Sequence, residues 1–191
     1  MMSEVVRGAS SARRVAEMQF ERGIIMNIDN HCSDLYRQRD WKALHSALDT
    51  ASPGRDSDER RQIGFWRANA LSAEGRHDEA IDALRAIGSD CRCRTRVSKN
   101  IAENLRRLGR DMEAIEELKN APLAEEWDCF RALVLDAKYV LAHLLASNGL
   151  EVDKAILDDI PDGYIHITDR GHRISKSDLM DMISGRKKSS I

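Results

Sequence analysis

The charged side chains of this sequence are segregated into two adjacent runs of opposite sign. Residues 91–110 contain seven Lys and Arg but a single acid, which gives a net charge of +6. Residues 111–136 contain eight Asp and Glu but two bases, which gives a net charge of −6. A charge run on a helix either lies against solvent or attracts a ligand of opposite charge. The basic run is therefore the first candidate for a site that binds an acidic ligand.

The cysteines and histidines predict neither a metal site nor a catalytic centre. Cys91 and Cys93 form a close pair, but the second such pair that would complete a four-ligand zinc site is missing. His31 and Cys32 are neighbours in sequence, so on a helix they point in different directions. The six histidines are scattered over different predicted elements, and there is no phosphate-binding glycine loop or nucleophile elbow. We therefore expect no metal, no cofactor and no catalytic residues.

Length and composition favour an all-α, cytoplasmic protein. The 191 residues are 42% hydrophobic but only 5% aromatic, with three prolines, a balance that suits long helices better than a β-sandwich. A net charge of −2 gives no overall attraction to nucleic acid or to an acidic membrane. No segment approaches the ~20 apolar residues of a membrane span, and charged residues interrupt the first candidate helix, unlike a signal peptide. Four unevenly spaced cysteines predict reduced thiols.

A repeat of thirty-four residues organises the middle of the chain. Two short loops, one beginning at Gly75 and one at Gly109, are each preceded by an apolar helix and followed by an Ala-Ile pair. The same shift aligns Ala68 with Ala102, Leu71 with Leu105, Ala80 with Ala114, Ile81 with Ile115 and Leu84 with Leu118. An earlier copy has Arg39 in place of the turn glycine. The spacing in each copy predicts two antiparallel helices joined by a tight turn. Glycine suits this turn because it adopts a left-handed backbone conformation at little cost.

This pattern resembles the tetratricopeptide repeat family, whose units are helical hairpins of the same length with small residues in both helices and glycine at the turn. The resemblance covers about residues 25–122. It implies a short α-solenoid of stacked hairpins, because one hairpin alone cannot bury its apolar face. We predict an N-terminal helix over residues 1–24, a helical repeat domain over 25–160, and a C-terminal strand and helix that form a cap or tail over 161–191.

The resemblance places the basic run inside a concave groove, because first helices line the groove in that family. Residues three or four apart share one face of a helix, so four charged residues of the basic run form a stripe. Matching positions one repeat earlier add an aromatic and an amide. The predicted binding residues are Phe65, Asn69, Arg96, Lys99, Glu103 and Arg106. Some members of the family clamp the carboxylate end of a peptide with such side chains. The alternative is a solvated helix face whose bases pair with acids of adjacent hairpins.

The C-terminal segment changes character after two further predicted helices, over about residues 125–146 and 152–159. Residues 164–168 alternate as a strand, and Ser175 or Ser177 is predicted to cap a last helix that ends near Ile183. Residues 164–173 resemble the wing of winged-helix DNA-binding domains, which lays Arg and His against phosphates. The alternative is a capping strand or hairpin at the end of the solenoid.

The predicted function is a non-catalytic protein-binding adaptor, chaperone or immunity-type partner that binds a protein or an acidic peptide, with no membrane partner. The alternative is a nucleic-acid-associated transcriptional regulator that uses the basic run and the wing-like segment. Salt dependence separates the two, because a regulator binds duplex DNA with a steep salt slope. An enzyme comes third, and would require a cleft that gathers titratable residues.

Overall fold

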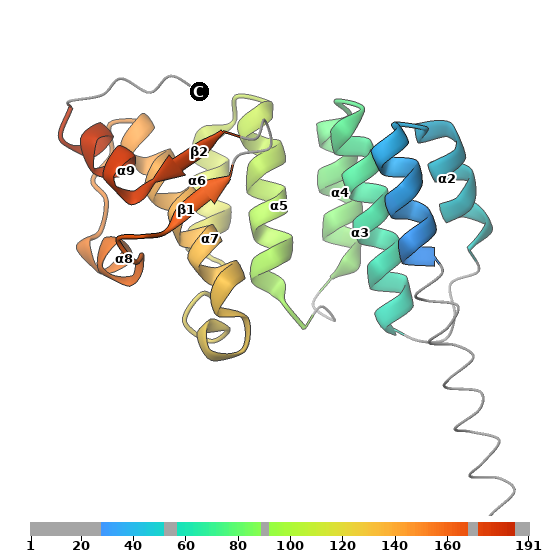
Figure 1. Ribbon diagram of the computed structural model, residues 1–191, viewed down its shortest axis with the longest axis horizontal. Helices are drawn as coiled ribbons and strands as arrows, with labels where there is room; N and C mark the ends of the chain where they lie inside the picture. The colour runs from blue at the N-terminus through green and yellow to red at the C-terminus, as the bar shows by residue number, and fades with distance from the viewer. Residues whose placement is uncertain (1–27, 52–56, 89–91, 168–171, 186–191) are drawn as a thin grey trace, which may run out of the picture. The chain divides into compact units, whose positions relative to one another are not determined.

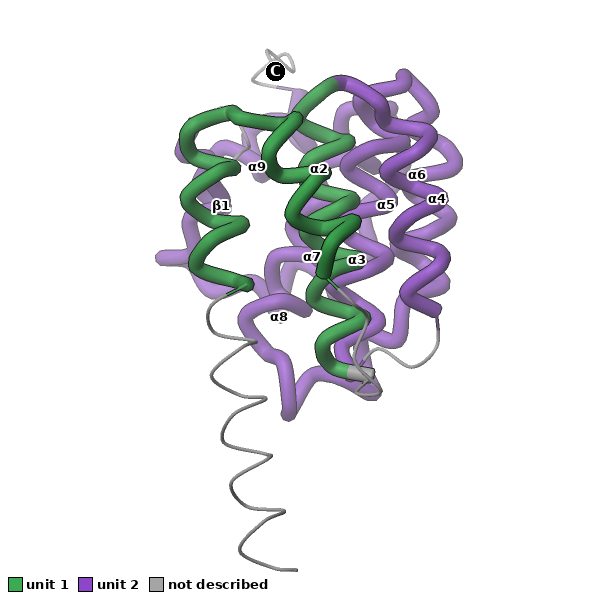
Figure 2. Tube along the Cα trace, turned by 90° about the vertical axis from the view of Figure 1, so that its right-hand side faces the viewer, with its two compact units in different colours: residues 1–74 green, residues 75–191 purple. Residues whose placement is uncertain are grey.

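The computed structural model describes residues 28–51, 57–88, 92–167 and 172–185 of the chain (Figure 1). These residues are mostly helical, with one two-stranded sheet, which confirms the all-α prediction. The chain forms two compact units, Met1–Glu74 and Gly75–Ile191 (Figure 2). The boundary falls at the turn of the predicted Gly75 hairpin, so its two helices belong to different units. The predicted N-terminal helix over 1–24 lies outside the described residues.

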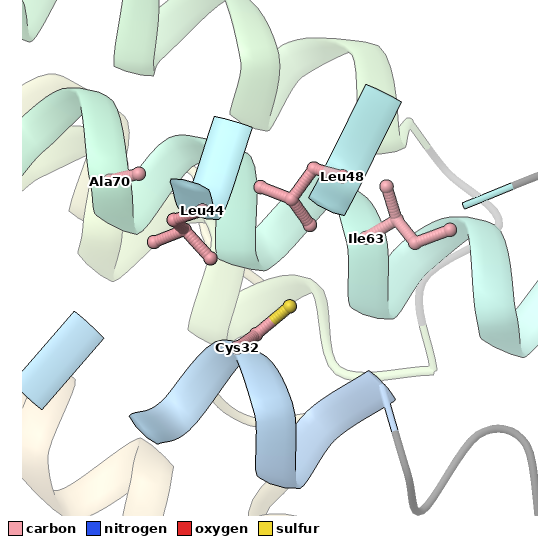
Figure 3. Close-up of a cluster of buried hydrophobic side chains, with 5 residues drawn as sticks. All are labelled: Cys32, Leu44, Leu48, Ile63 and Ala70. Atoms are coloured by element: carbon pink, nitrogen blue, oxygen red, sulfur yellow. The ribbon is translucent and has the colours of Figure 1, made fainter. Parts of the chain in front are cut away.

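Unit 1 contains a helix through residues 28–38, α2 (Trp41–Thr50) and α3 (Ser57–Ala73). The side chain of Asp40 caps α2 by accepting a hydrogen bond from the backbone N–H of Ala43 at 3.0 Å. Apolar side chains spaced by one helical turn form the core between the helices. This core consists of Cys32, Leu44, Leu48, Ile63 and Ala70 (Figure 3).

Unit 2 contains α4 (His77–Ile87), α5 (Arg94–Arg107), α6 (Asp111–Lys119), α7 (Trp127–Ser147) and α8 (Lys154–Asp159), followed by β1 (Ile165–Ile167), β2 (Arg173–Ser175) and α9 (Lys176–Ile183). Helix α5 packs against α4, α6 and α7. The alanines and leucines that the repeat aligned in these helices are buried, as the repeat predicts: Ala80, Leu84, Ala102, Leu105, Ala114 and Leu118. Small alanines let the paired helices approach closely, and the leucines fill the layers between them.

The turns of the repeat have the predicted left-handed backbone. Gly75 has φ = 80° and Gly109 has φ = 73°, and Arg39 takes φ = 57° at the equivalent place in the first copy. After each glycine an arginine pairs with the glutamate three residues later: Arg76 Nε bonds Glu79 at 2.7 Å, and the same pair recurs thirty-four residues later at Arg110 and Glu113, also at 2.7 Å. The repeat therefore extends to side-chain geometry that apolar spacing alone does not predict.

Replacing Gly109 with alanine should lower the free energy of unfolding by about 1 kcal/mol, because an L-residue is disfavoured at a left-handed position. A Cβ at Gly109 would have no heavy atom within 4 Å, so backbone conformation alone sets the cost. Urea denaturation of Gly109→Ala and Gly109→Asn measures it, with asparagine expected to cost less because it tolerates this conformation. Equal stability of all three proteins would contradict the assignment of the turn.

The N-terminus of α5 is capped by a residue from a distant loop. Cys93 occupies the cap position but makes no side-chain bond to the helix. The buried carboxylate of Glu126 instead accepts hydrogen bonds from the backbone N–H groups of Arg94, at 2.8 Å, and Thr95, at 3.0 Å. Burial alone would raise the pKa of Glu126, but these hydrogen bonds outweigh it and hold the pKa below its ordinary value. Glu126 thereby joins the start of α7 to the start of α5.

The C-terminal segment folds back onto α7. Strands β1 and β2 form an antiparallel pair in which His166 lies opposite Ile174. Ser175, one of the two serines predicted as the cap, caps α9 in a capping box with Asp178. Strand β2 makes this segment a hairpin, one of the alternatives that the sequence left open, and brings the chain to this cap. Tyr139, Ala142, Ile160 and Leu179 form the core that holds the segment to α7.

A search of the described helices for a stretch long and apolar enough to cross a bilayer finds none.

Candidate functional site

The six predicted binding residues lie in both units. Phe65 and Asn69 are on α3 in unit 1, where Phe65 is buried with 5% of its surface exposed and Asn69 is half-buried. The other four residues lie on α5 in unit 2, and all four are half-buried. The groove between Phe65 and Asn69 on one side and α5 on the other stays a prediction.

Within unit 2, α5 contributes to a polar cluster centred on Asp136 of α7. Lys99 forms ion pairs with Asp136 and, at 3.2 Å, with Glu103 one turn along α5. From β1, His166 Nδ1 donates a hydrogen bond to Asp136 Oδ1 at 2.6 Å, and from the residue before β1 the hydroxyl of Tyr164 donates to the same oxygen at 3.1 Å. One carboxylate therefore joins α5, α7 and the C-terminal hairpin, which Figure 1 shows in front of α7.

The charges of this cluster are mutually stabilised. Burial alone would raise the pKa of Asp136, but the hydrogen bond from His166 and the charge of Lys99 lower it to about 2. Burial alone would lower the pKa of Lys99, but Glu103 and Asp136 raise it above its ordinary value. Burial and the neighbouring Asp136 raise the pKa of the Tyr164 hydroxyl. At neutral pH the cluster therefore consists of an ionised carboxylate, an ammonium group and a neutral phenol.

An aromatic stack fixes the orientation of His166. Its ring lies parallel to the ring of Tyr139, with centroids 4.9 Å apart and planes inclined by 16°. The hydroxyl of Tyr139 donates to the backbone oxygen of Ser175 at 3.3 Å, so the same tyrosine also holds β2. An imidazole oriented by a carboxylate is the arrangement of a general base, but none of the described residues places a hydroxyl or thiol in hydrogen-bond contact with His166. The cluster as it stands is an anchor for the hairpin.

Sequence reasoning identified Lys99 and Glu103 but missed Asp136, Tyr139, Tyr164 and His166 as their neighbours. The available signal was the position of Asp136, a single acid in a long apolar stretch of α7. A carboxylate is rarely buried without a partner, so such an acid indicates a cation from another element. The ion pair of Lys99 with α7 also matches what the solvated-face alternative expected of the basic run.

The described cysteines form no disulfide with one another: Cys32 and Cys93 are buried, and Cys129 is exposed. No group of three or more His, Cys, Asp or Glu side chains within the described ranges is placed to hold a metal ion.

Comparison of the chain with protein-family models, with curated proteins and with solved structures finds no match. The resemblance to tetratricopeptide repeats therefore rests on the thirty-four-residue pattern and on the geometry of its turns.

Proposed function

We propose that the protein is a non-catalytic, helical-repeat binding protein that recognises an acidic peptide segment of a partner through the basic residues of α5. The observation that supports this proposal is that basic side chains of α5 already bind carboxylates from other segments of unit 2. Lys99 pairs with Asp136 of α7, and Arg94 pairs with Glu125, at 2.7 Å, from the loop before α7. Helix α5 thus receives carboxylates from other segments at both places, and an acidic peptide offers the same group.

The proposed ligand contacts are two of the four residues of the stripe on α5. Lys99 is 17% exposed and is engaged with two carboxylates, so it serves the fold and not the ligand. Arg96 and Arg106, at either end of the stripe, are half-buried and accessible in part. The guanidinium group of arginine matches a carboxylate with two parallel hydrogen bonds, which favours these two residues as the ligand contacts.

Reversing both charges, in the double variant Arg96→Glu with Arg106→Glu, should weaken binding of an acidic peptide more than tenfold, or ~1.4 kcal/mol. The probe is a fluorescein-labelled peptide of Asp, Glu, Ala and Leu with a free C-terminus, measured by fluorescence anisotropy in physiological salt. The matched control is Lys42→Glu with Arg60→Glu, which makes the same charge change at exposed positions in unit 1. Urea midpoints verify that each variant is folded.

Three outcomes would contradict the proposal. The first is that the double variant binds the acidic peptide as tightly as the wild type does. The second is that the control variant loses as much affinity as the double variant. The third is that a peptide with Asn and Gln in place of Asp and Glu binds as well as the acidic peptide. A short DNA duplex is included in the same assay. Tighter binding of the duplex with a steep salt dependence would support the nucleic-acid-associated regulator instead.

A further inference from the structure

Helix α2 has two faces whose side chains differ in size. One face carries Leu44 and Leu48, which pack in the core of unit 1 beside Cys32 of the helix through residues 28–38 (Figure 3). The other face starts at Ala43 and continues with the residues three, four, seven and eight positions later, which is the spacing of one side of a helix. The side chains of this second face are all small: Ala43, Ser46, Ala47, Thr50 and Ala51.

The second face of α2 lines an open groove in unit 1. Ile28 and His31, one turn apart on helix 28–38, form the other wall, and the groove has a volume of about 450 Å³. Most of the lining residues are apolar. The hydroxyl of Thr50 donates to the backbone oxygen of Ser46 at 2.9 Å, so its hydrogen bond is made within α2. The groove therefore suits an apolar side chain better than a polar ligand.

Unit 2 shows how this chain covers an apolar helix face. The face of α7 that carries Tyr139 and Ala142 is covered by the C-terminal segment of the same chain, through Ile160 and Leu179. In helical-repeat proteins the terminal helices need such a cover, because no further repeat packs against them. In unit 1 the groove beside α2 stays open among the described residues.

The segment that directly precedes the groove is suited to cover it. Residues 1–27 lie outside the described part of the chain, and they join helix 28–38 at Ile28, which is itself a wall of the groove. The sequence predicts a helix over residues 1–24, so only residues 25–27 connect the two helices. A connection this short places consecutive helices side by side and antiparallel. Apolar residues of the segment recur at helical spacing: Ala12, Val15, Ala16 and Phe20.

We propose that residues 12–24 dock into the groove between helix 28–38 and α2, with Phe20 as the large side chain that the small residues of α2 accommodate. Protein interiors pack densely, so a large side chain is matched by small ones. A short helix is marginally stable in water, and burial of its apolar side supplies the missing stability. The short connection gives this segment a high effective concentration at the groove, which favours it over a separate partner. The docking uses no residue of the proposed peptide contacts on α5.

Hydrogen–deuterium exchange of the full chain, read by mass spectrometry, tests the docking. The amides of residues 12–24 should exchange at least tenfold more slowly than those of a synthetic peptide of residues 1–24, because a docked helix protects its amides. Ala47→Glu places a charge in the groove and should remove this protection. Ala132→Glu, the same change at an exposed position on α7, is the control and should retain it. Urea midpoints verify that both variants are folded.

A second pair of variants changes only the segment and leaves the groove intact. Phe20→Glu should remove the protection, whereas Met18→Glu, across the predicted helix from Phe20, should retain it. Exchange as fast as in the free peptide would overturn the proposal. Unchanged protection in Phe20→Glu or in folded Ala47→Glu, or its loss in either control, would do the same. Protection that rises with protein concentration would assign the groove to the segment of a second copy and would overturn docking within one chain.

Discussion

Asp136→Asn should lower the free energy of unfolding by about 3–5 kcal/mol at neutral pH, as expected when one partner of a buried ion pair is removed. The substitution leaves the largely buried ammonium group of Lys99 without its carboxylate on α7. It also weakens the hydrogen bonds from His166 and Tyr164 that hold the C-terminal hairpin. Urea denaturation measures the loss. Asp158→Asn, at an exposed position on α8, is the control and should change stability by less than ~0.5 kcal/mol.

The same residue gives stability a defined pH dependence. In the folded protein the pKa of Asp136 is about 2, below the value of 3.8 expected in the unfolded chain. Because the folded pKa is the lower one, the carboxylate stabilises the fold above pH 4, and this contribution of about 2 kcal/mol is lost as the pH falls towards 2. Asp136→Asn should remove this part of the pH profile. Parallel profiles for the wild type and Asp136→Asn would show that Asp136 is not the titrating group.

Truncation of a single core leucine should have an effect of similar size. Leu84→Ala in α4 and Leu105→Ala in α5 should each lower the free energy of unfolding by about 2–5 kcal/mol, because their side chains are 1% and 2% exposed. Leu150→Ala, at a position that is 39% exposed, makes the same chemical change without opening a cavity. Urea midpoints of the three variants provide the comparison. A loss below ~0.5 kcal/mol at both buried positions would disprove the packing that the repeat implies.

The order and type of the helices in unit 2 were predictable because their signals are local. Apolar residues recur with the helical period in α5 and α6, and Gly109 between them marks a backbone conformation that other residues avoid. Ser175 lies at the start of α9 in a capping box that spans only three residues. Such interactions join near neighbours in the chain, so the sequence pattern contains both partners of each one.

Arg39 and β2 are two features whose backbone conformation the local sequence pattern did not predict. Arg39 adopts a left-handed conformation in a position where the repeat has glycine elsewhere, because the surrounding helices fix the turn whatever residue fills it. Strand β2 is only three residues long and has no alternation of its own to detect. Its extended backbone is set by pairing with β1 and by the bond from Tyr139 to Ser175.

The sequence by itself determined the helical class, the positions of the glycine turns and the charge run on α5. Only the tertiary structure decided what that charge run meets. Asp136 joins Lys99 to His166, and Glu126 caps α5, across separations of thirty or more residues in the chain. Periodicity cannot identify such pairs, because it specifies which face of a helix is buried but not which face of another helix covers it. The energy of a buried charge depends on that second face.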